Sequence, residues 1–355
     1  MLCPPGLLAD GVPPPASPTP PVQAADGPGG VKASHAAVIK TSYGEGGTQY
    51  WLYEPDQPKP ATAPVIVFIH GWSAMNPAIY GAWIDHIVKR GNIVVFPRYQ
   101  STILTPPHNF TPNVIASIQD AIKRLKNDPG HVRPELDHVA AVGHSVGGLL
   151  VANVCALASE SGLPPIRAVM STEPGRTTTN QGDTFVELAD MKKIPAETLL
   201  LAVAGDRDTL VGKTDALRIF RESVMVSPEN KNFVLVVSDA HGTPSLIASH
   251  LAPVAPDLDY DTSQGSAIRR PLPRVRGVMI DAMDYYCFWK LFDGLCDAAF
   301  YGTDRQYALG NTPEQRYMGR WSDGTAVKEL QITVGLPVTA AADPATPPAP
   351  TAAPR

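Results

Sequence analysis

A serine within a short glycine-rich stretch is the residue of this chain best placed to do chemistry. Residues 143–148 read G-H-S-V-G-G, follow an apolar run at 139–142 and lead directly into small and apolar residues typical of a helix. This is the G-x-S-x-G pattern of a serine held on a tight turn between a strand and a helix. The turn exposes the hydroxyl beside a helix N-terminus, whose partial positive charge favours a developing anion. The pattern predicts that Ser145 is a nucleophile.

An attacking serine needs a base that accepts its proton, and three histidines come into consideration. His241 follows an apolar run that predicts a strand, and it lies in a turn-like Ala-His-Gly context downstream of the serine. We therefore predict His241 as the base, because a loop position would let its ring reach Ser145. We interpret His250, in a segment with a helical pattern, as structural, and His144, beside the serine, as a packing residue.

The base in turn needs a carboxylate that orients its ring and stabilises the imidazolium. Asp208 follows a predicted strand and gives the chain order serine, aspartate, histidine of the hydrolase pattern, so we predict it as this acid. We expect Asp206 to bond nearby loop N–H groups. Asp239 is too close in sequence to His241 to reach the far ring nitrogen. Glu173, after another predicted strand, stays open as an alternative acid.

The negative oxygen that forms during acyl transfer needs backbone N–H donors. Val146 would supply one, because it is the first residue of the helix that follows the nucleophile. The second is expected from the H-G-W-S loop that follows the apolar run at 65–69. Within this loop we predict the N–H of Trp72 as the donor, with Ser73 as the alternative.

The loops after the predicted strands also supply the expected substrate contacts. We predict that Gly71, Trp72, Met75 and Tyr80 line the cleft, together with the loop 97–110. This set is apolar with some aromatic residues, which favours an ester with a medium-length acyl or aromatic group.

Apolar runs alternate with helical patterns along the chain, and these elements must position the residues above. The runs predict strands at 35–41, 49–53, 65–69, 92–96, 138–142, 166–170, 198–204 and 232–237. Helices are predicted between them and at about 278–300. The alternation predicts an α/β protein with a doubly wound, mostly parallel sheet flanked by helices. In such a sheet the chemistry lies at the carboxyl ends of the strands.

The motifs, taken in order, resemble those of the α/β-hydrolase superfamily, specifically its serine esterase and lipase branch. Four motifs are similar to those of chlorophyllases, dienelactone hydrolases and polyester hydrolases: H-G-W at 70–72, G-H-S-V-G-G at 143–148, G-D-R-D at 205–208 and A-H-G at 240–242. The resemblance covers about residues 35–250. It implies the α/β-hydrolase fold and hydrolysis of a small-molecule carboxylic ester without a cofactor. The serine argues against true dienelactone hydrolases, which use cysteine.

Other functions remain open at this stage. The same triad would serve an amidase, a peptidase or an acyltransferase, and a catalytically inactive scaffold used for binding is an alternative of another class. A further interpretation treats residues 251–336 as an interaction module, although the helical spacing of its aromatic residues is more typical of a core.

Length and composition indicate one globular domain with loose ends. The 355 residues carry a net charge of −5, which gives no reason to expect nucleic acid or an acidic membrane surface as a partner. No apolar run approaches the ~20 residues of a membrane span. The expected regions are a disordered Pro/Ala/Gly-rich leader at 1–34, the hydrolase domain at 35–336 and a disordered tail at 337–355. Within the domain we expect an irregular insertion at 251–277 and a helical part at 278–336.

The leader and the cysteines give indications of the cellular compartment in which the protein works. The leader resembles the spacer that follows an export signal, which slightly favours a secreted or periplasmic protein, although no signal peptide is visible. Cys287 and Cys296 would either close a short disulfide or lie as two buried thiols in a helix, and both readings stay open. No cysteine or histidine spacing indicates a metal site.

Overall fold

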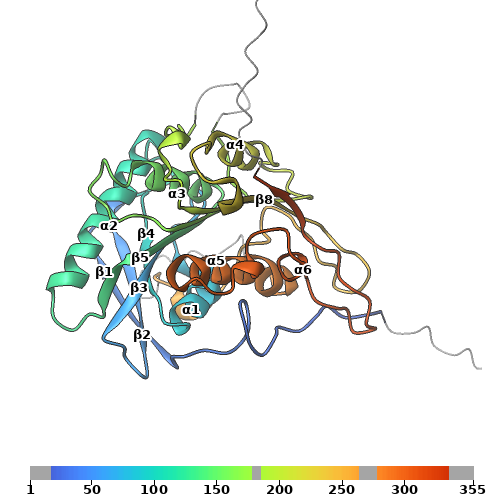
Figure 1. Cartoon of the computed structure of the whole chain (residues 1–355). Coiled ribbons are helices and arrows are strands. Elements are labelled where there is room, and N and C mark those ends of the chain that lie inside the picture. Colours follow the sequence, from blue (N-terminus) through green and yellow to red (C-terminus); the bar gives the residue numbers. More distant parts are fainter. Residues whose placement is uncertain (1–16, 178–184, 264–277, 336–355) are drawn as a thin grey trace, which may run out of the picture.

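A single sheet with helices on both faces forms the centre of the molecule (Figure 1). The computed structural model describes residues 17–177, 185–263 and 278–335. Within these residues the sheet has nine strands in the order β1-β2-β4-β3-β5-β6-β7-β8-β9. The run from β4 to β8 is parallel, and β1, β2 and β9 pair antiparallel at the two edges. The predicted mostly parallel α/β sheet is thereby confirmed.

All eight strands predicted from the sequence are present. The strands span Ala37–Tyr43 (β1), Tyr50–Asp56 (β2), Thr62–Ile69 (β3), Ile93–Pro97 (β4), Arg133–His144 (β5), Ala168–Thr172 (β6), Leu199–Gly205 (β7), Lys231–Val236 (β8) and Gln331–Val334 (β9). The ninth was not predicted, because it is four residues long and its side chains are mostly exposed.

The helices are arranged on both sides of this sheet. They span Gly81–Lys89 (α1), Phe110–Asn127 (α2), Val146–Leu157 (α3), Thr214–Glu222 (α4), Trp289–Tyr301 (α5) and Pro313–Arg316 (α6), and a π-helical turn at Asp284–Phe288 precedes α5. Short 3₁₀ turns lie at Gly46–Thr48, Pro77–Tyr80, Pro107–Asn109, Met191–Lys193, Pro228–Asn230, Leu258–Tyr260 and Arg305–Tyr307. Helices α2, α3 and α4 lie on one side of the sheet, and α1 and α5 on the other (Figure 1).

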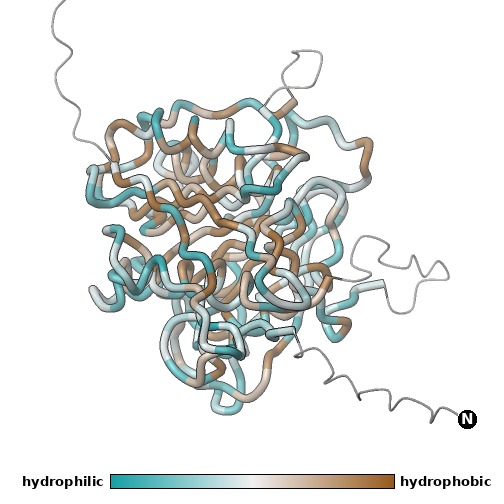
Figure 2. The backbone as a smooth tube through the Cα atoms, turned by 90° about the vertical axis from the view of Figure 1, so that its right-hand side faces the viewer, coloured by the Kyte–Doolittle hydropathy of each residue, from teal (hydrophilic) through white to brown (hydrophobic). Residues whose placement is uncertain are grey.

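The central strands are apolar along their whole length because both of their faces are covered. In β3, Val67 and Ile69 belong to the core cluster that includes α2 and α3, whereas Ile66 and Phe68 belong to the cluster that includes α1 and α5. All four side chains are fully buried. Hydrophobic stretches accordingly run through the interior of the chain trace, and hydrophilic ones gather on its outside (Figure 2).

The N-terminal segment at 17–34 is not the disordered leader that its composition predicts. The carbonyl of Pro18 accepts a hydrogen bond of 2.8 Å from the Thr243 N–H. The Gly29 N–H donates to the buried carboxylate of Asp293 at 2.8 Å. Proline-rich chain needs few backbone partners of its own, so bonds to the folded domain are enough to fix it. Residues 1–16 and the tail at 337–355 lie outside the described residues.

The expected irregular insertion at 251–277 packs on the domain in its described part. The N–H of Asp257 donates to the carbonyl of Ala78 at 2.9 Å, and the hydroxyl of Tyr260 donates to Asp85 at 2.9 Å. The arginine-rich stretch at 264–277 lies outside the described residues.

The C-terminal part completes the core rather than forming a separate module. Phe288 and Phe292 are buried, and their rings lie 6.2 and 6.3 Å from the ring of Trp83 in α1. Cys287 and Cys296 are free, buried thiols in helical segments. The prediction of a disulfide between them is therefore wrong, and the alternative of two buried thiols in a helix is confirmed. Among the described residues, no helix combines the length and the apolarity needed to cross a bilayer.

Candidate active site

Ser145 stands at the sharp junction between β5 and α3, as the sequence predicts. Its backbone angles, φ 58° and ψ −123°, are strained for a residue with a side chain. The N–H of Ser145 donates to the carbonyl of Thr172 at 3.0 Å, which ties the junction to β6. A Cβ on Gly147 would lie 2.1 Å from the carbonyl oxygen of Ile69, so only glycine lets α3 begin this close to β3. The glycine spacing therefore brings the serine to the end of the neighbouring strand.

The serine hydroxyl meets a histidine and an aspartate. The Nε2 atom of His250 lies 2.9 Å from the Oγ of Ser145, and its Nδ1 atom lies 2.8 Å from Oδ2 of Asp208. A carboxylate can only accept, so Nδ1 carries the ring hydrogen and Nε2 is left to accept from the serine O–H. The other oxygen of Asp208 accepts from the N–H groups of Leu210 and Val211 at 2.9 and 3.0 Å. Three side chains are thus aligned for proton transfer from the serine.

His241, predicted as the partner of Ser145, is placed elsewhere. Its Nε2 atom lies 2.8 Å from the carboxylate of Asp323, and 37% of its side chain is exposed. Two backbone hydrogen bonds of 2.8 Å between Asp239 and Leu246 close a hairpin that carries His241 away from the serine.

After this hairpin the chain returns to the edge of the sheet, and this return places His250 beside Ser145. The carbonyl of Ala248 accepts from the N–H of Arg207 at 3.0 Å, just beyond the end of β7. His250 follows in a turn and not in a helix. The apolar residues at 246–248 were the available signal, because they mark a second segment returning to the core.

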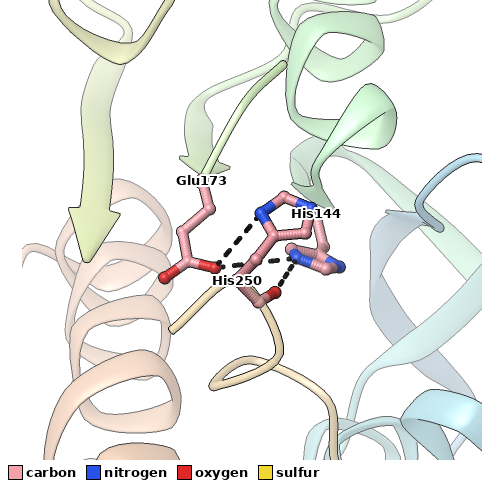
Figure 3. Close-up of side chains that lie close together, drawn as sticks. All are labelled: His144, Glu173 and His250. Carbon is pink, nitrogen blue, oxygen red and sulfur yellow. Dashed lines mark hydrogen bonds and ion pairs between the residues drawn. The ribbon is translucent and has the colours of Figure 1, made fainter. Parts of the chain in front are cut away.

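The other candidate acids have different partners. Asp206 accepts from the N–H and the hydroxyl of Ser238 at 3.0 and 2.5 Å, in line with the predicted loop-bonding role. Glu173, at the end of β6, points at the same histidine nitrogen as Asp208 but lies 3.8 Å from it (Figure 3). Among the described residues, neither carboxyl oxygen of Glu173 has a hydrogen-bond partner.

The two buried carboxyl groups differ in charge for a physical reason. Burial opposes ionisation of Asp208, but the hydrogen bonds from His250 and from the N–H groups of Val211 and Leu210 outweigh it and hold its pKa below the ordinary value. Burial raises the pKa of Glu173 well above its ordinary value, and the charge of Asp208 raises it further. The surroundings therefore favour the charged form of Asp208 and the neutral form of Glu173.

The loop predicted to donate to the oxyanion lies directly beside the serine. A Cβ on Gly71 would lie 3.2 Å from the Cβ of Ser145. The N–H of Ser73 already donates to Oε1 of Gln100 at 2.8 Å, so within this loop Trp72 stays the candidate donor. The N–H of Val146 is in the first turn of α3, where a helix provides no acceptor of its own. The structure brings both predicted segments to Ser145.

Comparison with known proteins agrees with this geometry. A family model described as Chlorophyllase matches residues 52–185, somewhat more than a third of the chain. The matched segment contains the loop at 70–73, Ser145 and Glu173. Together with the sheet order and the strained serine turn, this match decides the fold.

The chain has the α/β-hydrolase fold. The match indicates that it is a hydrolase of the kind that acts on esters. No curated protein matches the chain significantly. Asp208 and His250 lie beyond the matched segment, so their place in the site of this α/β-hydrolase rests on the structure.

The predicted substrate contacts of the α/β-hydrolase are only partly on its surface. Trp72 is 39% exposed, and its ring lies edge-on to that of Phe185 at 6.2 Å. Met75, three residues after Trp72 in the chain, is half-buried. Tyr80 is 1% exposed, so its prediction as a cleft-lining residue is wrong. Its hydroxyl instead lies beneath the loop and accepts from the Gly71 N–H at 3.1 Å.

His144, Glu173 and His250 of the α/β-hydrolase also place one potential metal ligand atom each within 4.8 Å of one another (Figure 3). The Nε2 atom of His144 is bonded to the carbonyl oxygen of His250 at 2.8 Å, and Nδ1 of His250 to Asp208. A cation would have to displace both hydrogen bonds and would need Glu173 ionised. The arrangement fits a hydrogen-bonded proton-transfer site better than a metal centre.

Proposed function

We propose that this α/β-hydrolase cleaves carboxylic esters through an acyl-enzyme on Ser145. One observation carries the proposal: the hydroxyl of Ser145 lies 2.9 Å from His250, whose other ring nitrogen lies 2.8 Å from Asp208. The strained turn supports it further, because such strain is typical of a nucleophile that must be held out from the backbone.

The reaction has two steps that use the same groups. In the first, His250 takes the proton from the Ser145 hydroxyl while the serine oxygen attacks the ester carbonyl carbon. The histidine then gives this proton to the leaving alkoxide, and the acyl group stays on the serine. In the second step His250 deprotonates a water molecule, whose oxygen attacks the acyl carbon. His250 then returns this proton to the Oγ of Ser145 as the bond between the serine and the acyl group breaks, and the acid is released. Asp208 stabilises the imidazolium that forms in each step.

The N–H groups of Val146 and Trp72 are proposed as the donors to the carbonyl oxygen as it becomes negative. The contact between the Gly71 backbone and Ser145 supports this assignment for the loop. The position of Val146 at the start of α3 supports it for the helix. Loss of one such donor typically costs 10²–10³-fold in kcat.

Exposed apolar side chains on the loops that follow the strands support an apolar substrate. The apolar rim consists of Trp72, Ile103, Leu104, Leu210, Ile247 and Leu251. Two of its members flank His250 in the chain, and Leu210 follows Asp208 closely. Apolar groups gathered at a functional edge favour burial of an apolar ligand surface. We therefore expect esters with a medium-length acyl or aromatic group to be better substrates than acetate esters.

Replacement of Ser145 by alanine tests the proposal. Hydrolysis of p-nitrophenyl esters should fall by several orders of magnitude, because a triad nucleophile carries most of the rate enhancement. A fluorophosphonate probe should label the wild-type chain at Ser145 and leave Ser145→Ala unlabelled. Unchanged hydrolysis by the variant, or an unlabelled wild type, would refute the proposal. A panel of esters and amides of increasing chain length would then define the substrate.

A further inference from the structure

His144, the neighbour of the nucleophile, connects the two loops that serve it. The N–H of Gly71 donates to the hydroxyl oxygen of Tyr80 at 3.1 Å. That hydroxyl lies 2.9 Å from Nδ1 of His144, and Nε2 of His144 lies 2.8 Å from the carbonyl oxygen of His250. One unbroken chain of hydrogen bonds thus runs from the loop beside Ser145 to the backbone of the histidine that faces it.

The direction of every bond in this chain is determined by chemistry. The Gly71 N–H can only donate, so the Tyr80 oxygen accepts, and the hydroxyl lies within donating distance of Nδ1 of His144. The carbonyl of His250 can only accept, so Nε2 of His144 carries the ring hydrogen. In a neutral ring Nδ1 then has a lone pair, which accepts from Tyr80. The chain is complete only with the imidazole neutral.

The surroundings of His144 keep its ring neutral. The side chain is 4% exposed. Burial, and then the proximity of His250, lower the pKa of His144 to about 3. The carboxyl group of Glu173 lies 3.7 Å from Nε2 of His144, and burial and Asp208 raise its pKa, which favours its uncharged form. His144 therefore serves as a hydrogen-bond bridge and not as an acid or base.

The bridge joins parts of the site whose relative position matters for catalysis. A Cβ on Gly71 would lie 3.2 Å from Ser145 and 3.5 Å from Nδ1 of His144. The next peptide of the same loop carries the Trp72 N–H. The other end of the bridge is the backbone of His250 itself. A change of spacing between these two loops would misalign the oxyanion donor and the base together.

We propose that His144 is a positioning residue that sets the distance between the oxyanion loop at 70–73 and His250. This inference rests on the proposed function. The sequence suggested only packing for His144, but packing would not need a donor and an acceptor aimed at two separate loops. Tyr80 is the second residue of this hydrogen-bonded bridge, because its hydroxyl links the Gly71 N–H to the ring of His144.

Replacing His144 by leucine and by glutamine tests the inference. Leucine removes both hydrogen bonds, and kcat for a p-nitrophenyl ester should fall by about 10²-fold, with KM little changed, because small displacements near reacting groups cost this much. Glutamine offers one donor and one acceptor and should recover most of the lost kcat. His138→Leu is the matched control, since His138 lies six residues earlier in the same strand and its ring bonds Glu135.

Tyr80→Phe keeps the inference testable if His144→Leu does not fold. This variant removes one oxygen atom and should lower kcat in the same way. Combined with His144→Leu it should add no further loss, because both changes break the same chain. Full kcat in folded His144→Leu or in Tyr80→Phe, or an equal loss in the leucine and glutamine variants, would overturn the inference.

The two proposals fail in distinguishable ways. If Ser145→Ala is as active as the wild type, the proposed function is wrong. If Ser145→Ala is inactive but the His144 and Tyr80 variants keep full kcat, only the positioning role is wrong.

Discussion

The Nε2 atom of His250 lies 2.9 Å from the Oγ of Ser145, although 105 positions separate the two residues in the chain. After the hairpin closed by Asp239 and Leu246, the chain returns to the end of β7, where the carbonyl of Ala248 accepts from the Arg207 N–H. This return brings His250 to the serine. His241, which precedes His250 in the chain, lies within that hairpin and bonds Asp323 instead of Ser145.

Replacing each of the two histidines by alanine should show which of them is the base. His250→Ala is expected to lower kcat by roughly 10⁴-fold or more, because the serine loses its base. His241→Ala should leave kcat unchanged, since it removes a bond to Asp323 and a ring contact with Trp321, neither of which involves Ser145. Ester hydrolysis under saturating substrate gives both values. An inactive His241→Ala together with an active His250→Ala would reverse the assignment.

The two carboxyl groups near His250 should also differ in their effect. Asp208→Asn is expected to lower kcat by about 10⁴-fold, because an amide can hold the ring in the wrong tautomer. Glu173→Gln should change kcat little, because the raised pKa of Glu173 favours its neutral form and its carboxyl group lies 3.8 Å from the ring nitrogen. The measurement is kcat for both variants at the same pH. If Glu173→Gln were the more damaging change, Glu173 would be the acid.

The raised pKa of Glu173 predicts how stability depends on pH. Its pKa is raised in the folded chain above the ordinary value of 4.5, so the unfolded chain releases this proton at lower pH than the folded chain does. The contribution of Glu173 to stability is therefore full below the ordinary pKa and is lost as the pH rises toward the folded pKa. The loss amounts to about 1.4 kcal/mol per pH unit over that range.

Glu173→Gln removes this ionisation and provides the check. The melting temperature of the variant, measured against the wild type from about pH 4 to about pH 8, should show a difference that grows in favour of the variant as the pH rises. A constant difference across this range would mean that Glu173 is ionised in the folded chain.

The close approach of α3 to β3 should make Gly147 intolerant of any side chain. A Cβ would lie 2.1 Å from the Ile69 carbonyl oxygen and 2.6 Å from that of His70, so Gly147→Ala must displace the helix start. We expect a loss of about 3 kcal/mol in unfolding free energy and a large loss of kcat. Denaturant unfolding and ester hydrolysis measure the two effects.

Gly162→Ala is the control for this glycine. Its backbone has φ +64°, and in the described part of the chain no atom beyond its immediate neighbours lies within 4 Å of the added Cβ. It should cost only about 1–2 kcal/mol of backbone strain and leave kcat unchanged. Equal effects of the two substitutions on kcat would argue against a steric role for Gly147.

The sequence by itself determined the elements and the turn that carries Ser145. Eight strands and the turn at Ser145 could be predicted, because apolar periodicity and glycine spacing act over a few neighbouring residues. Asp208 could be predicted as well, since the order of strands in an α/β sheet places the loop after β7 at the same edge as the serine.

Only the tertiary structure decided which histidine meets the serine and what lies beneath the site. The choice of His250 over His241 depends on hydrogen bonds between Asp239 and Leu246, which depend on how a loop closes and leave no periodic signal. Tyr80 is an aromatic residue after an active-edge strand, and only packing shows that its hydroxyl faces inward to Gly71 and His144. Local patterns determine elements, whereas contacts between distant segments determine which side chains meet.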